Sequence, residues 1–218
     1  MFKAAIFDLD GTLMDSATDL ERACNYALSK YNFPEVDSQK HKLMLGKGRR
    51  KLAESIISEF FGYEQNGVIE NFLKYYNEFY DAHMFDNTKP YDGITDMRDV
   101  LNKHGIITTV LSNKPHDFTL KLARRFFNGK VKYVSGLRDG YKTKPDPKSL
   151  LEIIDRFGLK KEECIYIGDT EIDIQSAKNA GVKSIGVLWG FRDRSCLERE
   201  GADFIASNID EMIGIILS

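Results

Sequence analysis

The chain has 218 residues, of which 42% are hydrophobic and 29% are charged, and its formal net charge is −2. This length suits one sizeable α/β domain, or a core domain with a small insertion. The weak net charge gives no positive field for nucleic acid or an anionic membrane, and no apolar run approaches the ~20 residues of a membrane span. Acidic residues interrupt the N-terminal stretch where a secretory signal is apolar, so we expect a cytoplasmic protein that binds neither nucleic acid nor a membrane.

Short apolar runs that alternate with single helical stretches predict parallel βαβ units. The expected strands are 3–10, 105–113, 132–136, 164–169, 184–190 and 203–207. The expected helices between them begin near Asp92 and cover 116–127, 147–157 and 170–180, with Gly181 as a C-cap of the last one. This order is typical of an α/β fold with a doubly wound parallel sheet.

The interval 15–86 has no convincing strand and instead shows apolar residues at helical spacing. Its helical faces hold Leu20, Ala23, Ala27 and Leu28, then a short segment near 38–44, then Leu52, Ile56, Ile57 and Phe60, and finally Val68, Phe72, Leu73, Tyr76, Phe79 and Tyr80. We therefore expect an all-helical cap domain over 15–86, inserted into a core domain made of 1–14 and 87–218. Such a cap would lie over the edge of the sheet where the carboxyl ends of the strands open, which is where ligands bind in open parallel sheets.

Carboxylates follow the first of these strands and a later one. Asp8 and Asp10, in FDLDGTL, are two apart and share one side of an extended backbone, where they repel each other unless a cation is present. Asp169 and Asp173, in GDTEID, lie one helical turn apart after the run CIYIG. An acidic helix-capping loop is the alternative at each place, but together the carboxylates indicate a site for a hard cation.

Polar donors follow two other segments. Ser112 and Asn113 come directly after the run IITTVL and could form a turn or direct donors at an anion. Lys144 lies in KPDP, where the prolines fix the backbone, although a solvated surface turn is the alternative. Mg²⁺ is usually held by one or two carboxylates and a substrate phosphate. Acids and donors together therefore predict a magnesium-assisted phosphate site.

FDLDGTL, LSNK, KPDP and GDTEID, in this order, resemble the four motifs of the haloacid dehalogenase superfamily. The run GDTEIDIQSAKNAGVKSIGVLWGF is similar to the phosphoglycolate phosphatase branch. The resemblance extends along the whole chain, with the helical insertion in the place of the family's cap. It implies a Rossmann-like core and a magnesium-dependent phosphatase.

The resemblance also implies roles for the motif residues. Asp8 would attack phosphorus and become an aspartyl phosphate, while Asp10 would act as general acid and then general base. The metal ligands would be the side chains of Asp8 and Asp169 and the backbone carbonyl of Asp10. The remaining roles fall to Ser112 and Lys144, which would hold phosphoryl oxygens in catalysis, to Thr12 and Asn113 near the substrate, and to Asp173, which would orient Lys144 or a metal-bound water.

The organic part of the substrate is expected to meet the cap. Gly46, Lys47 and Arg49 lie between two of its predicted helices and offer cations for a substrate carboxylate, although GKGRRK could also be a solvated basic turn. Phosphoglycolate is the first expectation for this small phosphorylated metabolite, followed by phosphosugars, pyrophosphate and nucleotides. We expect a monomer or a homodimer.

Three other functions are open to such a core. A phosphosugar mutase of the β-phosphoglucomutase kind typically has a bulky aliphatic residue where Thr12 stands, which favours a phosphatase. A binding protein on a degenerate scaffold would have lost a nucleophile or metal carboxylate, and none is missing. Dehalogenase chemistry would leave the metal carboxylates unexplained.

Overall fold

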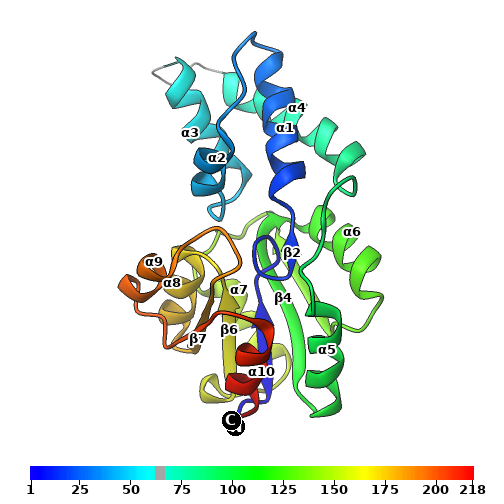
Figure 1. Cartoon of the computed structure of the whole chain (residues 1–218), viewed down its shortest axis with the longest axis vertical. Helices are drawn as coiled ribbons and strands as arrows, with labels where there is room; N and C mark the ends of the chain where they lie inside the picture. The colour runs from blue at the N-terminus through cyan, green and yellow to red at the C-terminus, as the bar shows by residue number, and fades with distance from the viewer. Residues whose placement is uncertain (62–66) are drawn as a thin grey trace. The chain divides into compact units, whose positions relative to one another are not determined.

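The chain folds into two compact units, which are described here from a computed structural model that covers residues 1–61 and 67–218 (Figure 1). The core unit comprises Met1–Asp15 and Pro90–Ser218, and the helical unit comprises Ser16–Lys89. The helical unit therefore begins one residue later and ends three residues later than the interval 15–86 that the sequence suggests. No helix of the described ranges is both long and apolar enough to cross a bilayer.

A parallel sheet of six strands, in the order β5-β4-β1-β6-β7-β8, forms the centre of the core unit. These strands are β1 (Ala4–Phe7), β4 (Ile107–Pro115), β5 (Tyr133–Leu137), β6 (Cys164–Gly168), β7 (Lys183–Val187) and β8 (Phe204–Ala206). All six expected strands are confirmed. Phe7 lies opposite both Val110 and Ile167, so the residues that follow β1 and β6 meet the last part of β4 at one edge.

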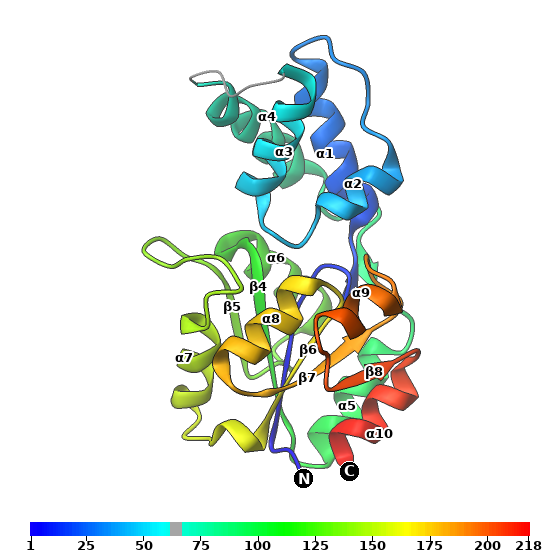
Figure 2. The ribbon, with the colours of Figure 1, turned by 90° about the vertical axis from the view of Figure 1, so that its left-hand side faces the viewer.

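Helices cover both faces of this sheet (Figure 2). They are α5 (Ile94–Lys103), α6 (His116–Phe127), α7 (Lys148–Arg156), α8 (Glu171–Ala180), α9 (Arg194–Arg199) and α10 (Ile209–Leu217). Helix α5 packs beside α10 on one face, and α7 packs beside α8 on the other. Leu150, Ile153 and Ala177 pack there against Ile6 and Tyr166 of the sheet. The doubly wound α/β class is therefore confirmed.

The helical unit consists, in the part of it that the structure describes, of the four helices expected from apolar spacing. They are α1 (Ala17–Ser29), α2 (Ser38–Met44), α3 (Arg49–Phe61) and α4 (Val68–His83). Helix α4 packs against α1 and α3 and buries Phe72, Tyr76 and Tyr80. The aromatic stripe of α4 thus stabilises this unit by apolar burial.

Where the chain passes between the units, two short strands, β2 (Met14–Asp15) and β3 (Lys89–Pro90), pair with each other. Beside this pair, the buried carboxylate of Asp19 accepts four hydrogen bonds from two residues at the other end of the helical unit. Asn87 donates through its backbone N–H (2.9 Å) and its Nδ2 (2.8 Å), and Thr88 through its backbone N–H (2.8 Å) and its Oγ1 (2.7 Å). Asp19 therefore ties the start of the helical unit to its end.

Asp19→Asn is expected to lower the free energy of unfolding at neutral pH by about 2–3 kcal/mol, because hydrogen bonds to a charged acceptor are lost. Burial alone would raise the pKa of Asp19, but the donors of Asn87 and Thr88 outweigh it and lower this pKa. The wild-type advantage should therefore be present at neutral pH and shrink as the pH falls through the folded pKa. Chemical denaturation measures both effects. Glu78→Gln, at an exposed site of α4, is the control, and an equal shift in both variants would contradict the prediction.

His41 in α2 is buried, and neither ring nitrogen has a hydrogen-bond partner among residues 1–61 and 67–218. Burial lowers its pKa to about 4. The unfolded chain therefore binds a proton at higher pH than the folded one, and stability is lost as the pH falls below ~6.5.

From this one residue we expect a loss of about 2 kcal/mol between pH 7 and pH 5, measured as the difference between the urea-midpoint shifts of the wild type and of His41→Leu. His41→Leu should remove most of this loss, whereas His104→Asn, at an exposed site, should keep it. An unchanged pH dependence in His41→Leu would show that this histidine is not the cause.

Candidate active site

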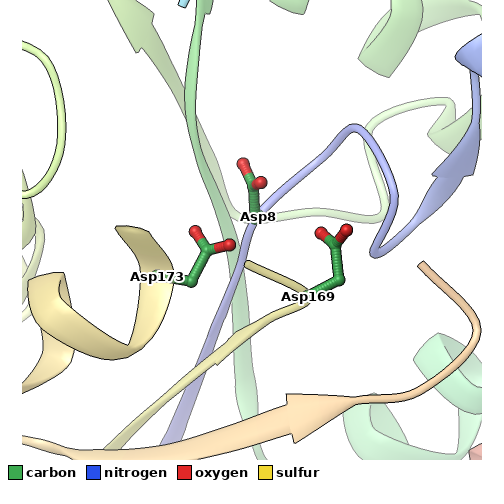
Figure 3. Close-up of side chains that lie close together, drawn as sticks. All are labelled: Asp8, Asp169 and Asp173. Atoms are coloured by element: carbon green, nitrogen blue, oxygen red, sulfur yellow. The ribbon is translucent and has the colours of Figure 1, made fainter. Parts of the chain in front are cut away.

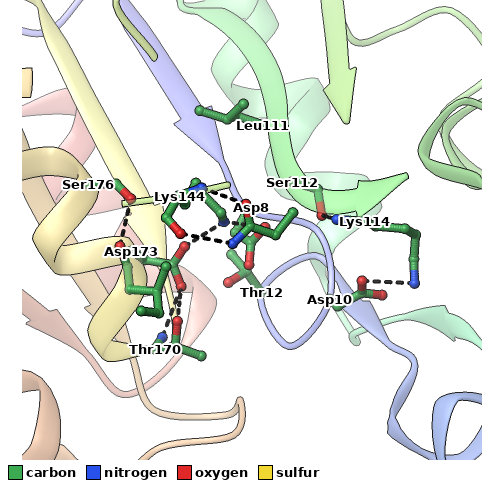
Figure 4. A network of polar contacts seen from close by, with 12 residues as sticks. Asp8, Asp10, Thr12, Leu111, Ser112, Lys114, Lys144, Thr170, Asp173 and Ser176 are labelled. Carbon is green, nitrogen blue, oxygen red and sulfur yellow. Dashed lines mark hydrogen bonds and ion pairs between the residues drawn. The ribbon is translucent and has the colours of Figure 1, made fainter. Parts of the chain in front are cut away.

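The core unit brings together the predicted site residues of all four motifs at the edge where β1, β4 and β6 end (Figure 4). They are Asp8, Asp10, Thr12, Ser112, Asn113, Lys144, Asp169 and Asp173, and the contacts described below connect them within one region. Residues more than 160 positions apart in the sequence thus meet because parallel strands end at one edge.

Three buried carboxylates form the centre of this region (Figure 3). Asp8, Asp169 and Asp173 each offer one oxygen atom, and these atoms lie within 4.8 Å of one another. Burial, together with the charge of Asp173, raises the pKa of Asp8 to about 7, although Lys144 opposes the shift. Burial and the charges of Asp173 and Asp8 likewise hold the pKa of Asp169 well above its usual range. Ionisation of both carboxyl groups in this cluster is therefore unfavourable in the absence of an added cation.

Asp169 is held by donors on both carboxylate oxygens. Thr12 Oγ1 donates to Oδ1 (2.9 Å) and the Phe191 backbone N–H donates to Oδ2 (2.8 Å). Glycine is required on two sides, because a Cβ atom at either Gly11 or Gly190 would lie 2.3 Å from an Asp169 side-chain atom. Asp169 therefore sits in a cradle made by the loops after β1 and β7. Gly190 and Phe191 belong to WGF, the end of the run that is similar to the phosphoglycolate phosphatase branch.

Lys144 is a buried cation surrounded by acceptors. Its Nζ donates to Asp173 Oδ1 (2.7 Å) and to Tyr166 Oη (3.0 Å) and lies 2.8 Å from Asp8 Oδ1. Burial alone would lower the pKa of Lys144, but Asp173 and Asp8 outweigh it and raise the pKa well above its usual range. Lys144 therefore stays protonated beside Asp8.

Asp173 has both oxygens engaged. Oδ1 accepts a hydrogen bond from the Lys144 ammonium. Oδ2 accepts from the backbone N–H (3.0 Å) and the hydroxyl (2.7 Å) of Thr170, the N-cap residue of helix α8. Gly168 leaves room for this arrangement, since a Cβ atom there would come 2.2 Å from the Asp173 side chain. Asp173 therefore acts as an anchor for Lys144, although it lies within reach of the other two carboxylates.

Three of the polar residues predicted near the substrate have different surroundings. The Asn113 amide binds the backbone of Lys144, accepting from its N–H (2.7 Å) and donating to its carbonyl (3.3 Å). Ser112 Oγ accepts from the Lys114 backbone N–H (3.2 Å), which leaves the hydroxyl proton of Ser112 to be donated. Thr12 likewise uses its hydroxyl on Asp169. Of the three, Ser112 is best placed to donate to an anion.

Asp10 lies outside the carboxylate cluster. Its Oδ2 is 2.8 Å from Nζ of Lys114, whose side chain is 4% exposed. The motif LSNK contains Lys114, but nothing in the sequence identifies this lysine as the partner of Asp10. Alternation along the strand gives no sign of this contact, because it depends on how the turn after β1 folds.

Gly46, Lys47 and Arg49 belong to the helical unit. Gly46 and Lys47 lie between α2 and α3, and Arg49 is the first residue of α3. The Arg49 guanidinium donates to the neutral amide oxygen of Asn77 in α4 (2.6 Å), and within the described ranges no carboxylate is within ion-pair distance of it. A part for these residues in substrate binding stays a prediction.

The donor set of the cluster fits a hard divalent cation. Carboxylate oxygens are the ligands that Mg²⁺ prefers, and two added positive charges would offset the burial and the mutual repulsion that raise the pKa values of Asp8 and Asp169. Asp169 accepts hydrogen bonds from neutral donors, whereas Asp173 is paired with the charged Lys144 ammonium, so Asp169 suits a metal better than Asp173 does, together with the neighbouring Asp8. Asp10 is adjacent through the chain, but its side chain faces Lys114.

Comparison with known proteins agrees with this geometry. Residues 5–187 match the family model of the haloacid dehalogenase-like hydrolases. A phosphoglycolate phosphatase of Xanthomonas campestris is 30% identical over 191 residues, which are 87% of this chain and 85% of that protein. An N-acetylmuramic acid 6-phosphate phosphatase of Pseudomonas aeruginosa is 29% identical and covers 98% of this chain and 94% of its own length.

Among solved structures, a candidate phosphoglycolate phosphatase from Lactobacillus delbrueckii superposes with a TM-score of 0.93 at 29% identity, over 99% of this chain and 98% of that one. A hydrolase from Pseudomonas syringae, at 24% identity, has a TM-score of 0.80 and shares the fold over 97% and 96% of the two chains. The resemblance seen in the four motifs is thereby confirmed. This chain belongs to the haloacid dehalogenase-like hydrolases, and phosphoglycolate phosphatases are among its relatives.

Proposed function

We propose that this hydrolase is a magnesium-dependent phosphatase that cleaves a small phosphomonoester through an aspartyl phosphate on Asp8. One observation carries the proposal: the Asp8 carboxylate lies between a protonated lysine, Lys144, and a second buried carboxylate, Asp169. A nucleophile in that position can face a phosphoryl group with positive charge on one side and a cation site on the other.

Magnesium would be held by the Asp8 and Asp169 side chains with the Asp10 backbone carbonyl, and it would supply positive charge that offsets repulsion between nucleophile and substrate. Thr12 and the Phe191 N–H fix the Asp169 carboxylate, so this ligand needs no reorganisation. An oxygen of Asp8 attacks phosphorus, a P–O bond to Asp8 forms, and the ester P–O bond breaks.

Asp10 gives its proton to the departing ester oxygen and then takes a proton from the water that attacks the aspartyl phosphate. That second attack releases inorganic phosphate and restores the Asp8 carboxylate. Lys144 stays charged beside Asp8 throughout, and Ser112 has a hydroxyl proton for a phosphoryl oxygen. Both residues therefore stabilise negative charge as it moves onto the transferred group.

The substrate is proposed to be a small phosphoester with a carboxylate, with phosphoglycolate first. Both relatives named above act on such molecules, since glycolate and N-acetylmuramic acid each carry a carboxyl group. Arg49 suits this chemistry because its partner Asn77 is neutral, which leaves the guanidinium charge to pair with an anion. Hexose phosphates, nucleotides and pyrophosphate lack such a group.

The test is a panel of phosphate esters assayed with Mg²⁺ and then with a chelator. We expect phosphoglycolate or N-acetylmuramate 6-phosphate to have a kcat/KM at least about tenfold above hexose phosphates, the factor that one charged contact of ~1.4 kcal/mol supplies. Faster turnover of a hexose phosphate would overturn the carboxylate preference and leave the phosphatase activity standing.

Arg49→Met sharpens the test. It should raise KM for phosphoglycolate and leave KM for ethyl phosphate, which has no carboxylate, nearly unchanged. Arg50→Met is the matched control, since the neighbouring Arg50 is exposed and pairs with Glu70 (2.7 Å). Equal changes for the two esters in Arg49→Met would exclude a carboxylate contact.

A further inference from the structure

The two aspartates of the first motif form ion pairs with two different lysines. Lys144 Nζ lies 2.8 Å from Asp8 Oδ1, and Lys114 Nζ lies 2.8 Å from Asp10 Oδ2. Figure 4 shows the two ion pairs at separate places, one on each side of the segment that follows β1. Lys144 accompanies the carboxylate proposed as nucleophile, and Lys114 accompanies the one proposed as acid and base.

Lys114 is fixed at both its backbone and its side chain. Its N–H donates to Ser112 Oγ (3.2 Å), and its carbonyl accepts from Thr119 Oγ1 (3.2 Å) in α6. The side chain is 4% exposed, whereas that of Asp10 is 17% exposed. A buried ammonium is costly unless an acceptor faces it, and the Asp10 carboxyl group can accept from Lys114 whether or not it carries a proton, so this contact is favoured over a solvated arrangement.

Backbone hydrogen bonds also fix the turn that carries Asp10, but they do not fix the orientation of its side chain. Gly11 N–H donates to the Met14 carbonyl (2.9 Å), and Met14 N–H donates to the Leu9 carbonyl (2.9 Å). These bonds set the backbone of Asp10 but not the rotation of its side chain. Lys114 reaches it from a neighbouring strand, β4.

We propose that Lys114 is the positioning residue of Asp10: it holds the carboxyl group in the direction from which its proton reaches the leaving oxygen. This inference rests on the proposed role of Asp10 as the acid. The proton moves from Asp10 to the ester oxygen as the P–O bond breaks, and Lys114 neither gains nor loses a proton. A misdirected acid loses part of the ~10²–10⁴-fold that general acid catalysis contributes.

Leaving groups of different basicity test this proposal. An alkoxide needs the proton, whereas the phenolate of 4-nitrophenyl phosphate is a weak base and departs without it. In Lys114→Met we therefore expect kcat/KM to fall by about 10–100-fold for phosphoglycolate or ethyl phosphate, and by less than about threefold for 4-nitrophenyl phosphate. We use kcat/KM because it reports the steps up to P–O cleavage and excludes hydrolysis of the aspartyl phosphate.

Two further variants locate the effect at Asp10. Asp10→Asn should show the same dependence on the leaving group, and adding Lys114→Met to it should cost little more on the alkyl ester, because a residue that acts through Asp10 has nothing left to direct. Lys142→Met is the matched control, since this lysine is exposed in the same unit, and it should leave both esters unaffected.

Each outcome decides the question. Equal losses on the two esters, or full additivity with Asp10→Asn, would overturn the positioning role. No hydrolysis of either ester by the wild type would instead refute the proposed phosphatase function. If thermal melting shows that Lys114→Met does not fold, Lys114→Arg replaces it, which keeps a cation at a changed distance. It should show a smaller effect of the same selectivity, and loss without selectivity would again refute the proposal.

Discussion

Asp8→Asn is expected to lower phosphate release by about 10⁴-fold or more, because a carboxamide cannot replace the carboxylate that attacks phosphorus. The variant keeps the shape of the side chain, so substrate binding should change far less than turnover. Acid-quenched single turnovers with ³²P-labelled substrate should give a labelled aspartyl phosphate in the wild type and none in the variant.

The same variant should fold without loss of stability in the absence of metal. Burial and Asp173 raise the pKa of Asp8 to about 7, so the ionised form of this residue is unfavourable in the folded protein, and metal-free wild type should lose stability as the pH rises toward that value. Thermal melting in a chelator, compared between pH 5 and pH 8, measures this. Asp139→Asn, at an exposed site, is the control, and substantial turnover by Asp8→Asn would exclude the covalent route.

Removal of Mg²⁺ is expected to abolish turnover and to lower the melting temperature, and re-addition should restore both. The stabilisation follows from mass action and reaches about 2.7 kcal/mol when free Mg²⁺ is 100 times its dissociation constant. The cause is the buried negative charge of Asp8 and Asp169, which a divalent ion neutralises. Differential scanning fluorimetry across a Mg²⁺ titration gives the readout without any substrate.

Asp169→Asn separates the metal site from general salt effects. Its melting temperature should respond to Mg²⁺ much less than that of the wild type, because one of the two proposed side-chain ligands has lost its charge. Asp155→Asn, at an exposed site of α7, should respond like the wild type. If Mg²⁺ does not change the melting temperature of the wild type, the proposed cation site is ruled out.

The fold was accessible from the sequence because its signals are local. Six apolar runs mark the parallel strands, and Gly181 adopts the positive φ of 74° expected of a helix C-cap. The short strands β2 and β3 were not foreseen, since two residues have no periodicity. Helices α9 and α10 also went unpredicted; α9 has six residues, and α10 is apolar along most of its length.

That the four motifs meet in one region follows from the order of the strands, but several contacts within this region do not follow from the sequence. Asp8 and Asp169 directly follow β1 and β6, Ser112 lies in the last part of β4, and Lys144 lies in the loop after β5. Two contacts depend on the directions of side chains at the edge of the sheet. Asn113 accepts a hydrogen bond from the Lys144 backbone N–H, and Tyr166 accepts one from the Lys144 ammonium. The hydrogen bond from the Phe191 N–H to Asp169 connects the loops that follow two different strands, and the sequence pattern does not indicate that these loops are close together.

Trp189 is the only tryptophan of the chain, and its indole N–H donates to the Thr12 carbonyl (3.0 Å). Thr12 in turn binds Asp169, so the fluorophore is two contacts from the carboxylate cluster. We therefore expect its emission to change when this site is occupied. Stopped-flow recordings on unlabelled enzyme could resolve ion binding, phosphoryl transfer and product release as separate phases.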